Sequence, residues 1–141
     1  LRVLGIKDLG IRKIASDAAV LKWSPDETKF IYRQTPLSDL EAKGEENVKG
    51  FKIYDLVERE SYDLPDAKSV TFLPDSLHLI LVEEGKIAVA DYDGSNKAVI
   101  YAGNFQDNFV FAWPDSSRLV VISSVPTPTA SEPNFFGINL K

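Results

Sequence analysis

The segment Leu21-Lys22-Trp23-Ser24-Pro25-Asp26 decides the fold, because it joins a strand pattern to a turn and because two similar segments follow further along the chain. Its apolar residues lie two apart, so they point to one face of a strand. Proline then restricts φ and aspartate bonds its own backbone, so the strand stops and turns. The related segments are Val70-Thr71-Phe72-Leu73-Pro74-Asp75 and Phe111-Ala112-Trp113-Pro114-Asp115, the last being one residue shorter at its turn.

A second apolar run begins five residues after each proline, so each unit reads as a hairpin. These runs are rich in β-branched and aromatic residues, which favour strands. They are Phe30-Ile31-Tyr32, Leu79-Ile80-Leu81 and Leu119-Val120-Val121. Third strands are predicted at 51–56, 86–91 and 135–140, and fourth strands at 60–64 and 97–101. The stretch 3–14 is expected to supply the outer strands of a preceding unit.

The prolines of the three turns stand at positions 25, 74 and 114, which gives a repeat of 49 and then 40 residues. Four short strands in a unit of about this length are typical of propeller blades. We therefore expect an all-β, β-propeller-like fold of about three four-stranded antiparallel blades in a single domain, 1–141. The expected units are 1–18 (partial), 19–66, 67–107 and 108–141. Because closed propellers have four or more blades, we expect either part of a longer propeller or a ring completed by another chain.

Two motifs resemble those of the TolB-type, WD-repeat-like propeller family. Trp23-Ser24-Pro25-Asp26 is similar to its "WSPDG" signature, and 87–96 is similar to a third strand that ends at a "D-x-D-G-x-N" turn. Glu27, Ser76 and Ser116 stand where the signature has glycine, and only the middle unit keeps the full second motif. The resemblance implies a binding platform, often outside the bacterial cytoplasm. The family also includes propellers that accompany peptidases, whose chemistry lies in a separate domain.

Composition excludes several classes of function. The net charge is −5 and the cations are scattered, which disfavours nucleic acid and anionic membrane surfaces as partners. The chain has no cysteine, so disulfides and thiolate chemistry are absent. The longest apolar run, 77–82, is far shorter than the roughly 20 residues needed to span a bilayer. No signal peptide is visible, and the start at Leu1 suggests a piece of a longer protein.

His78 is the single histidine and the first candidate for chemistry. It aligns with Lys29 and Arg118, each four residues after a turn proline, which favours a repeated surface position over a catalytic base. No G-x-S-x-G motif or cysteine offers a nucleophile. Asp91, Asp93 and Asn96 are weak candidates for a cation site, but too few oxygen ligands accompany them for a calcium loop, and an Asp-Gly turn explains the pattern.

Three aromatic residues, Trp23, Phe72 and Trp113, are assigned to one repeat position and are expected to fill the space between blades rather than to stack on a ligand. The repeat signature as a whole consists of Trp23, Pro25, Asp26, Phe72, Pro74, Asp75, Trp113, Pro114 and Asp115. The insertion at 34–50 and the proline-rich stretch at 123–133 read as solvated loops, with contact to a partner as the alternative for each.

The resemblance to TolB-type propellers, together with the lack of a catalytic motif, implies a non-catalytic protein-binding or scaffolding module without a cofactor, located outside the cytoplasm. One alternative is an accessory propeller domain of a larger hydrolase or peptidase. Another is a self-assembling unit, in which open blade edges join two copies in a homodimer, since an unpaired edge strand invites pairing.

Overall fold

The computed structural model describes residues 1–5, 11–34, 50–124 and 132–140, and these residues form strands without any helix. The N-terminal hairpin consists of β1 (Arg2–Leu4) and β2 (Ile11–Lys13). Blade 1 consists of β3 (Ala19–Trp23), β4 (Lys29–Arg33), β5 (Phe51–Asp55) and β6 (Glu60–Asp63). Blade 2 consists of β7 (Ser69–Phe72), β8 (His78–Glu83), β9 (Lys86–Asp91) and β10 (Ala98–Ala102). Blade 3 consists of β11 (Val110–Ala112), β12 (Arg118–Ser123) and β13 (Asn134–Asn139).

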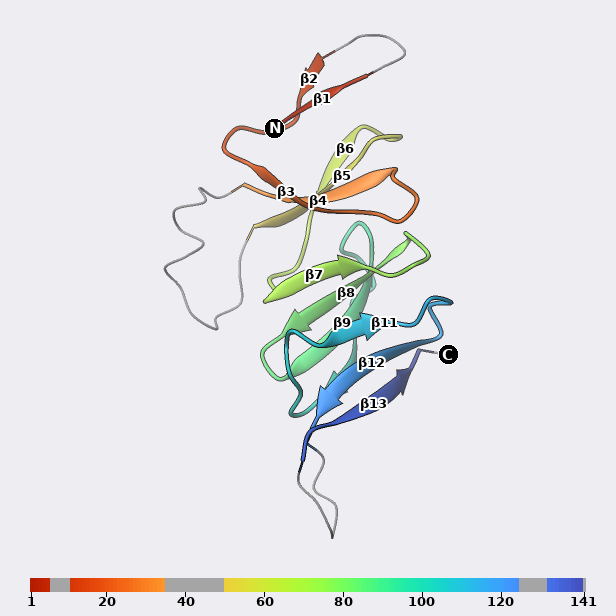
Figure 1. Cartoon of the computed structure of the whole chain (residues 1–141). Coiled ribbons are helices and arrows are strands. Elements are labelled where there is room, and N and C mark those ends of the chain that lie inside the picture. The colour runs from red at the N-terminus through yellow and green to blue at the C-terminus, as the bar shows by residue number, and fades with distance from the viewer. Residues whose placement is uncertain (6–10, 35–49, 125–131, 141) are drawn as a thin grey trace.

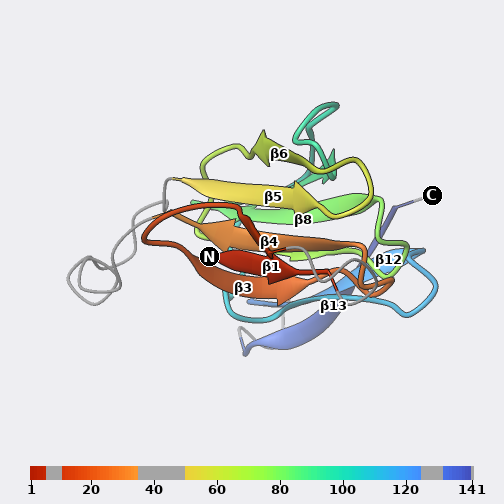
Figure 2. The same cartoon turned by 90° about the horizontal axis from the view of Figure 1, so that it is seen from above.

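The four sheets follow one another along the molecule in chain order (Figure 1). Within each sheet every strand pairs antiparallel with its neighbour in sequence, so strand order equals chain order. Figure 2 shows the first and last strands of blade 1, β3 and β6, at opposite sides of that sheet. The predicted all-β, propeller-like fold is confirmed as an open, partial one. Two blades have the predicted four strands, while the described part of blade 3 has three.

Burial along β8 shows why this strand reads as an unbroken apolar run. Leu79 and Leu81 face blade 1, while Ile80 and Val82 face blade 3. All four side chains are buried. A strand that is covered on both faces needs apolar residues at every position, in place of the alternation of a half-exposed strand.

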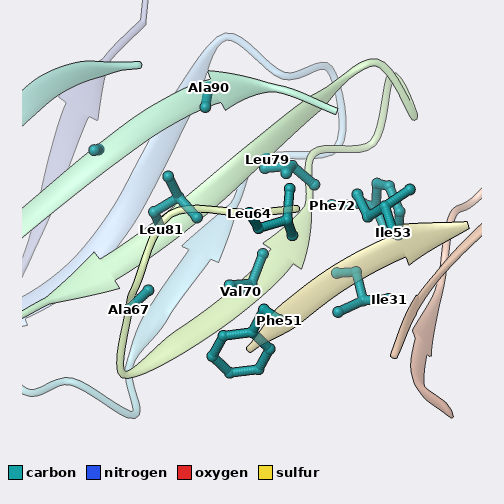
Figure 3. Close-up of a cluster of buried hydrophobic side chains, with 11 residues drawn as sticks. Ile31, Phe51, Ile53, Leu64, Ala67, Val70, Phe72, Leu79, Leu81 and Ala90 are labelled. Carbon is teal, nitrogen blue, oxygen red and sulfur yellow. The ribbon is translucent and has the colours of Figure 1, made fainter. Parts of the chain in front are cut away.

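The largest cluster of buried side chains lies between blades 1 and 2 (Figure 3). Blade 1 contributes Ile31 and Ile53, which meet Phe72 and Leu79 of blade 2. A second cluster joins blade 2 to blade 3 through Leu119 and other residues. A third joins blade 1 to the N-terminal hairpin. The core is therefore a series of interfaces between sheets, which is the reason a single blade is not stable alone.

Polar contacts connect the same blades at their rims. The amide of Asp26 donates to Ser76 Oγ across the first interface, at 3.0 Å. Lys68 Nζ lies 2.6 Å from Glu84 and 2.7 Å from Asp107, which precedes blade 3. Hydrogen bonds to these two carboxylates raise the pKa of Lys68. The cation therefore stays charged and ties the two blades together.

The Pro-Asp turns share one backbone geometry. Glu27 donates its N–H to Ser24 O, Ser76 to Leu73 O and Ser116 to Trp113 O, at 2.9 to 3.0 Å. These three donors have φ values of 59°, 60° and 57°, in the left-handed region that glycine adopts most easily. The three turns of this chain therefore have the same shape, although a non-glycine residue stands at the positive-φ position of each.

The hydrogen-bond register corrects the alignment of the third turn. The amides of Ser24, Leu73 and Trp113 each donate to the carbonyl at the start of the following strand. Trp113 is thus equivalent to Leu73, and Ala112 is the equivalent of Phe72. The assignment of Trp113 to the position of Trp23 and Phe72 was wrong, and the third turn is not shorter. The large side chain at position 113 had suggested a match that the pairing does not support.

Candidate functional site

A groove of about 500 Å³ runs beside the first strands of all three blades. We call it the channel-side groove. Its walls come from β3, β7, β11 and the adjoining turns. The residues that line it are Lys22, Pro25, Ser69, Thr71, Phe72, Pro74, Val82, Asp107, Asn108, Val110, Phe111 and Ala112. Three blades thus contribute equivalent strands to one surface.

The groove combines polar side chains with open strand edges. Lys22 lies on the wall from blade 1, Ser69 and Thr71 on that from blade 2, and Asn108 and Val110 on that from blade 3. Among the described strands β7 pairs only with β8, and β11 only with β12. The free edges of β7 and β11 therefore offer backbone donors and acceptors to an added extended segment.

A second cavity, of about 520 Å³, lies between blades 2 and 3 and contains His78. His78 Nδ1 is 2.7 Å from Asp75 Oδ2, and Nε2 is 3.6 Å from Asp91 Oδ1. Both ring nitrogens thus face carboxylate oxygens, which ties the Pro-Asp turn to the end of β9. Apolar side chains, among them Leu73 and Ile100, complete the walls.

The structure brings His78 together with Asp91 and Asn96, which the sequence had placed in separate groups. Asn96 Nδ2 donates to Asp91 Oδ2 at 2.7 Å. Asp93 Oδ1 accepts from the amide and hydroxyl of Ser95, at 2.9 and 2.6 Å. These side chains thus hydrogen-bond within the turn. Across the part of the chain that the structure describes, no group of three or more histidine, aspartate or glutamate side chains is arranged to hold a metal ion.

The three basic residues after the turns do share a position, but it is not a surface position in every blade. Lys29 is buried, with Nζ 4.8 Å from the ring centre of Tyr92 in the next blade. The expectation of a repeated surface position was therefore wrong for Lys29. Each of the three pairs with the end of the third strand: Lys29 with Asp55, His78 with Asp91, and Arg118 with Asn139. The recurring Asp55 and Asp91 were the sequence signal for this pairing.

The aromatic residues of the repeat signature have different surroundings. Phe72 is 7% exposed and lies between blades 1 and 2, as expected. Trp23 is 53% exposed, because the two-stranded hairpin before blade 1 covers only part of that face. Trp113 is 49% exposed on the outer face of blade 3. The expectation that all three fill gaps between blades was wrong for both tryptophans.

The turn aspartates act on their own backbone. Asp75 Oδ1 accepts from the amides of Leu77 and His78, and Asp115 Oδ1 accepts from Ser117. Partial burial pushes the pKa of Asp26 up, but hydrogen bonds from Ser24 and Thr28 and the charge of Lys29 outweigh burial and lower it from 3.8 to about 2. The repeated Pro-Asp motif thus stabilises the hairpins, and it positions the walls of the groove and the His78 cavity.

The insertions at 34–50 and 123–133 fall almost wholly outside the described residues, and so does the predicted role of each as a solvated or partner-contacting loop. No helix in the described parts has the length and apolar character needed to cross a membrane.

Comparison with known proteins places the chain at the level of fold. No protein-family model matches it, and no curated protein matches it. Among solved structures it is similar to the β-propeller domain of the Trilobed protease from Pyrococcus furiosus, which is described as having an open velcro topology. The TM-score is 0.55 at 14% identity, over 96% of this chain and 44% of that one. The chain therefore spans less than half of that propeller and shares its fold.

Proposed function

We propose that the chain is a non-catalytic protein-binding module of the TolB-like propeller type, and that its channel-side groove receives an extended segment of a partner protein. The observation that supports this proposal is the meeting of β3, β7 and β11 around one groove. An extended peptide that adds to a free strand edge gains main-chain hydrogen bonds, and neighbouring side chains select its sequence.

The chemistry of the groove suggests what such a segment carries. Lys22 favours an acidic side chain at one wall, and Val110 and Ala112 favour an apolar one at the other. Asp107 is already engaged by Lys68 at 2.7 Å, so it adds less negative charge to the groove than an unpaired carboxylate would. We therefore expect the bound segment to be extended, with at least one acidic and one apolar residue.

A peptide selection tests this function. Short random peptides are displayed on phage and selected for binding to the chain. The binding site of each selected peptide is then mapped from changes in the amide chemical shifts of the labelled protein. We expect the shifts to cluster on β3, β7 and β11 and binding to weaken about tenfold or more in Thr71→Arg, which blocks the groove. Val57→Arg, in the exposed turn after β5, is the matched control and should bind as the parent does. Selected peptides that map to β6 and β10 instead would refute the proposal.

The second candidate function is an accessory propeller domain of a larger peptidase. It is favoured by the similarity to the propeller domain of a protease. The coding sequence on both sides of this chain distinguishes the two, because a contiguous hydrolase domain would make the groove a route or docking site for that enzyme's substrates. We also propose that the protein is located outside the cytoplasm. Fractionation of the source cells tests this location.

A further inference from the structure

The outer face of blade 3 is open and largely apolar, and it carries four large aromatic rings, one of which, Trp113, has the guanidinium carbon of Arg118 5.8 Å from its centre. Phe109, Phe111, Trp113 and Phe135 are 42%, 56%, 49% and 69% exposed. Val120 and Ile122 lie on the same face, opposite Phe111 and Phe135 in the strand pairing. We call these six residues the C-terminal face. Monomeric soluble domains rarely leave so many clustered aromatic side chains in contact with water.

The strand register shows which residues of blade 2 are equivalent to those of the C-terminal face. Phe135 pairs with Ile122 as Ile87 pairs with Val82, and Trp113 takes the place of Leu73. In blade 2, Leu73, Val82 and Ile87 are at most 3% exposed, because blade 3 covers them. The C-terminal face is therefore an interface between blades that lacks its second side in this structure.

The opposite end of the molecule offers a complementary surface, which we call the N-terminal end: Leu4, Ile11 and Trp23. Leu4 and Ile11 are paired across the hairpin and are 57% and 67% exposed. Arg2 and Lys13 flank them on the same side of the hairpin and are also exposed. Cations are attracted to the faces of aromatic rings, so this end suits a partner surface rich in phenylalanine and tryptophan.

We propose that a second copy of this chain occupies the C-terminal face, so that two copies form a two-fold ring. The C-terminal face of each copy packs against the N-terminal end of the other. The two ends of the molecule support this occupant, because one chain carries both the open C-terminal face and the exposed apolar N-terminal end. Two equivalent contacts close the assembly, whereas a single head-to-tail contact would continue into a fibre.

The experiment measures solution mass by light scattering over a concentration series. We expect a mass that rises to twice 15.7 kDa. Trp113→Ser with Phe135→Ser, and separately Ile11→Asp, should each weaken dimerisation about tenfold or more, since buried aromatic and apolar anchors dominate such interfaces. Val57→Ser removes an apolar residue that is 67% exposed elsewhere, and it should leave the mass unchanged. Circular dichroism verifies that every variant stays folded.

Mixing the two defective variants tests the head-to-tail geometry. The mixed dimer keeps one intact contact, between the C-terminal face of the Ile11→Asp chain and the N-terminal end of the other. We therefore expect the mixture to dimerise more strongly than either variant alone. A monomer at every concentration would overturn the proposal. So would a dimer that tolerates Ile11→Asp, since that result indicates two C-terminal faces packed on each other. Phe111 is shared by the C-terminal face and the channel-side groove, but Trp113 and Phe135 do not line the groove, so peptide binding by the Trp113→Ser, Phe135→Ser variant is a separate readout.

Discussion

At the scale of the residue, the position after each Pro-Asp pair is held at positive φ without a glycine. Glu27, Ser76 and Ser116 have φ values of 57° to 60°. A side chain in this region costs about 1–2 kcal/mol, because Cβ approaches the following carbonyl. Whether glycine at one of these positions increases the stability of the fold then depends on the contacts that the present side chain makes.

Glu27→Gly should therefore stabilise the chain more than Ser76→Gly does. Glu27 is exposed, so glycine relieves the strain and, after the added freedom of the unfolded chain, stabilises by a few tenths to about 1 kcal/mol. Ser76 Oγ accepts the amide of Asp26 from the neighbouring blade at 3.0 Å, and losing that bond costs about 0.5–1.5 kcal/mol. Urea unfolding of both variants measures the difference. Equal stabilisation by the two substitutions would show that the contact between the blades contributes nothing.

The turn carboxylates predict a loss of stability in acid. Hydrogen bonds that outweigh burial lower the pKa of Asp26 from 3.8 to about 2 and also lower that of Asp75. A lowered pKa in the folded state contributes stability above the unfolded value, and this contribution is lost as pH falls toward the folded value. The urea concentration at the unfolding midpoint should therefore decrease as the pH is lowered from about 4 to about 2. Asp26→Asn should flatten this dependence, and an unchanged slope would contradict the assignment.

At the scale of the element, the turn between β9 and β10 approaches blade 1 closely. Gly94 has φ of 85°, and a Cβ there would lie 2.9 Å from the carbonyl oxygen of Asp63. Gly85 has φ of 61°, and the nearest atom to its Cβ position is 4.0 Å away. The two glycines therefore share a backbone requirement but differ in the space around them.

This contrast defines a matched pair of variants. Gly85→Ala should destabilise by about 1 kcal/mol, from backbone strain alone. Gly94→Ala should cost at least about 1 kcal/mol more, because the added methyl group pushes blade 2 away from β6. Thermal or urea unfolding of the two variants gives the comparison. Equal costs would show that the two blades separate at this point without penalty.

At the scale of the whole molecule, the blades differ in how many of their own faces are covered by a neighbouring sheet. Blade 2 is packed on both sides, blade 3 has one open face, and the N-terminal hairpin covers blade 1 only in part. The rate of amide hydrogen exchange depends on such coverage, because local opening of a strand requires more free energy where more apolar contacts must break. The order of protection should follow the order of burial.

Hydrogen exchange should therefore be slowest in β8 and β9 and fastest in β1, β2 and β13. If two copies pair through the C-terminal face, protection of β11–β13 should also rise with protein concentration while that of β8 stays constant. Mass spectrometry of peptides after timed exchange resolves both effects. Uniform protection across the four sheets would mean that the chain unfolds as one cooperative unit.

The sequence alone determined the strands, the turns and the propeller-like stacking, because proline, aspartate and alternating apolar residues act over a few neighbours and recur with the blade. Pairing across strands was visible in Asp55 and Asp91, which lie opposite Lys29 and His78. Only the tertiary structure decided which aromatic residues are covered. Burial depends on the presence of an adjoining sheet, so Phe72 is enclosed while Trp23 and Trp113 are exposed. The groove of β3, β7 and β11 likewise exists only after the blades have packed against one another.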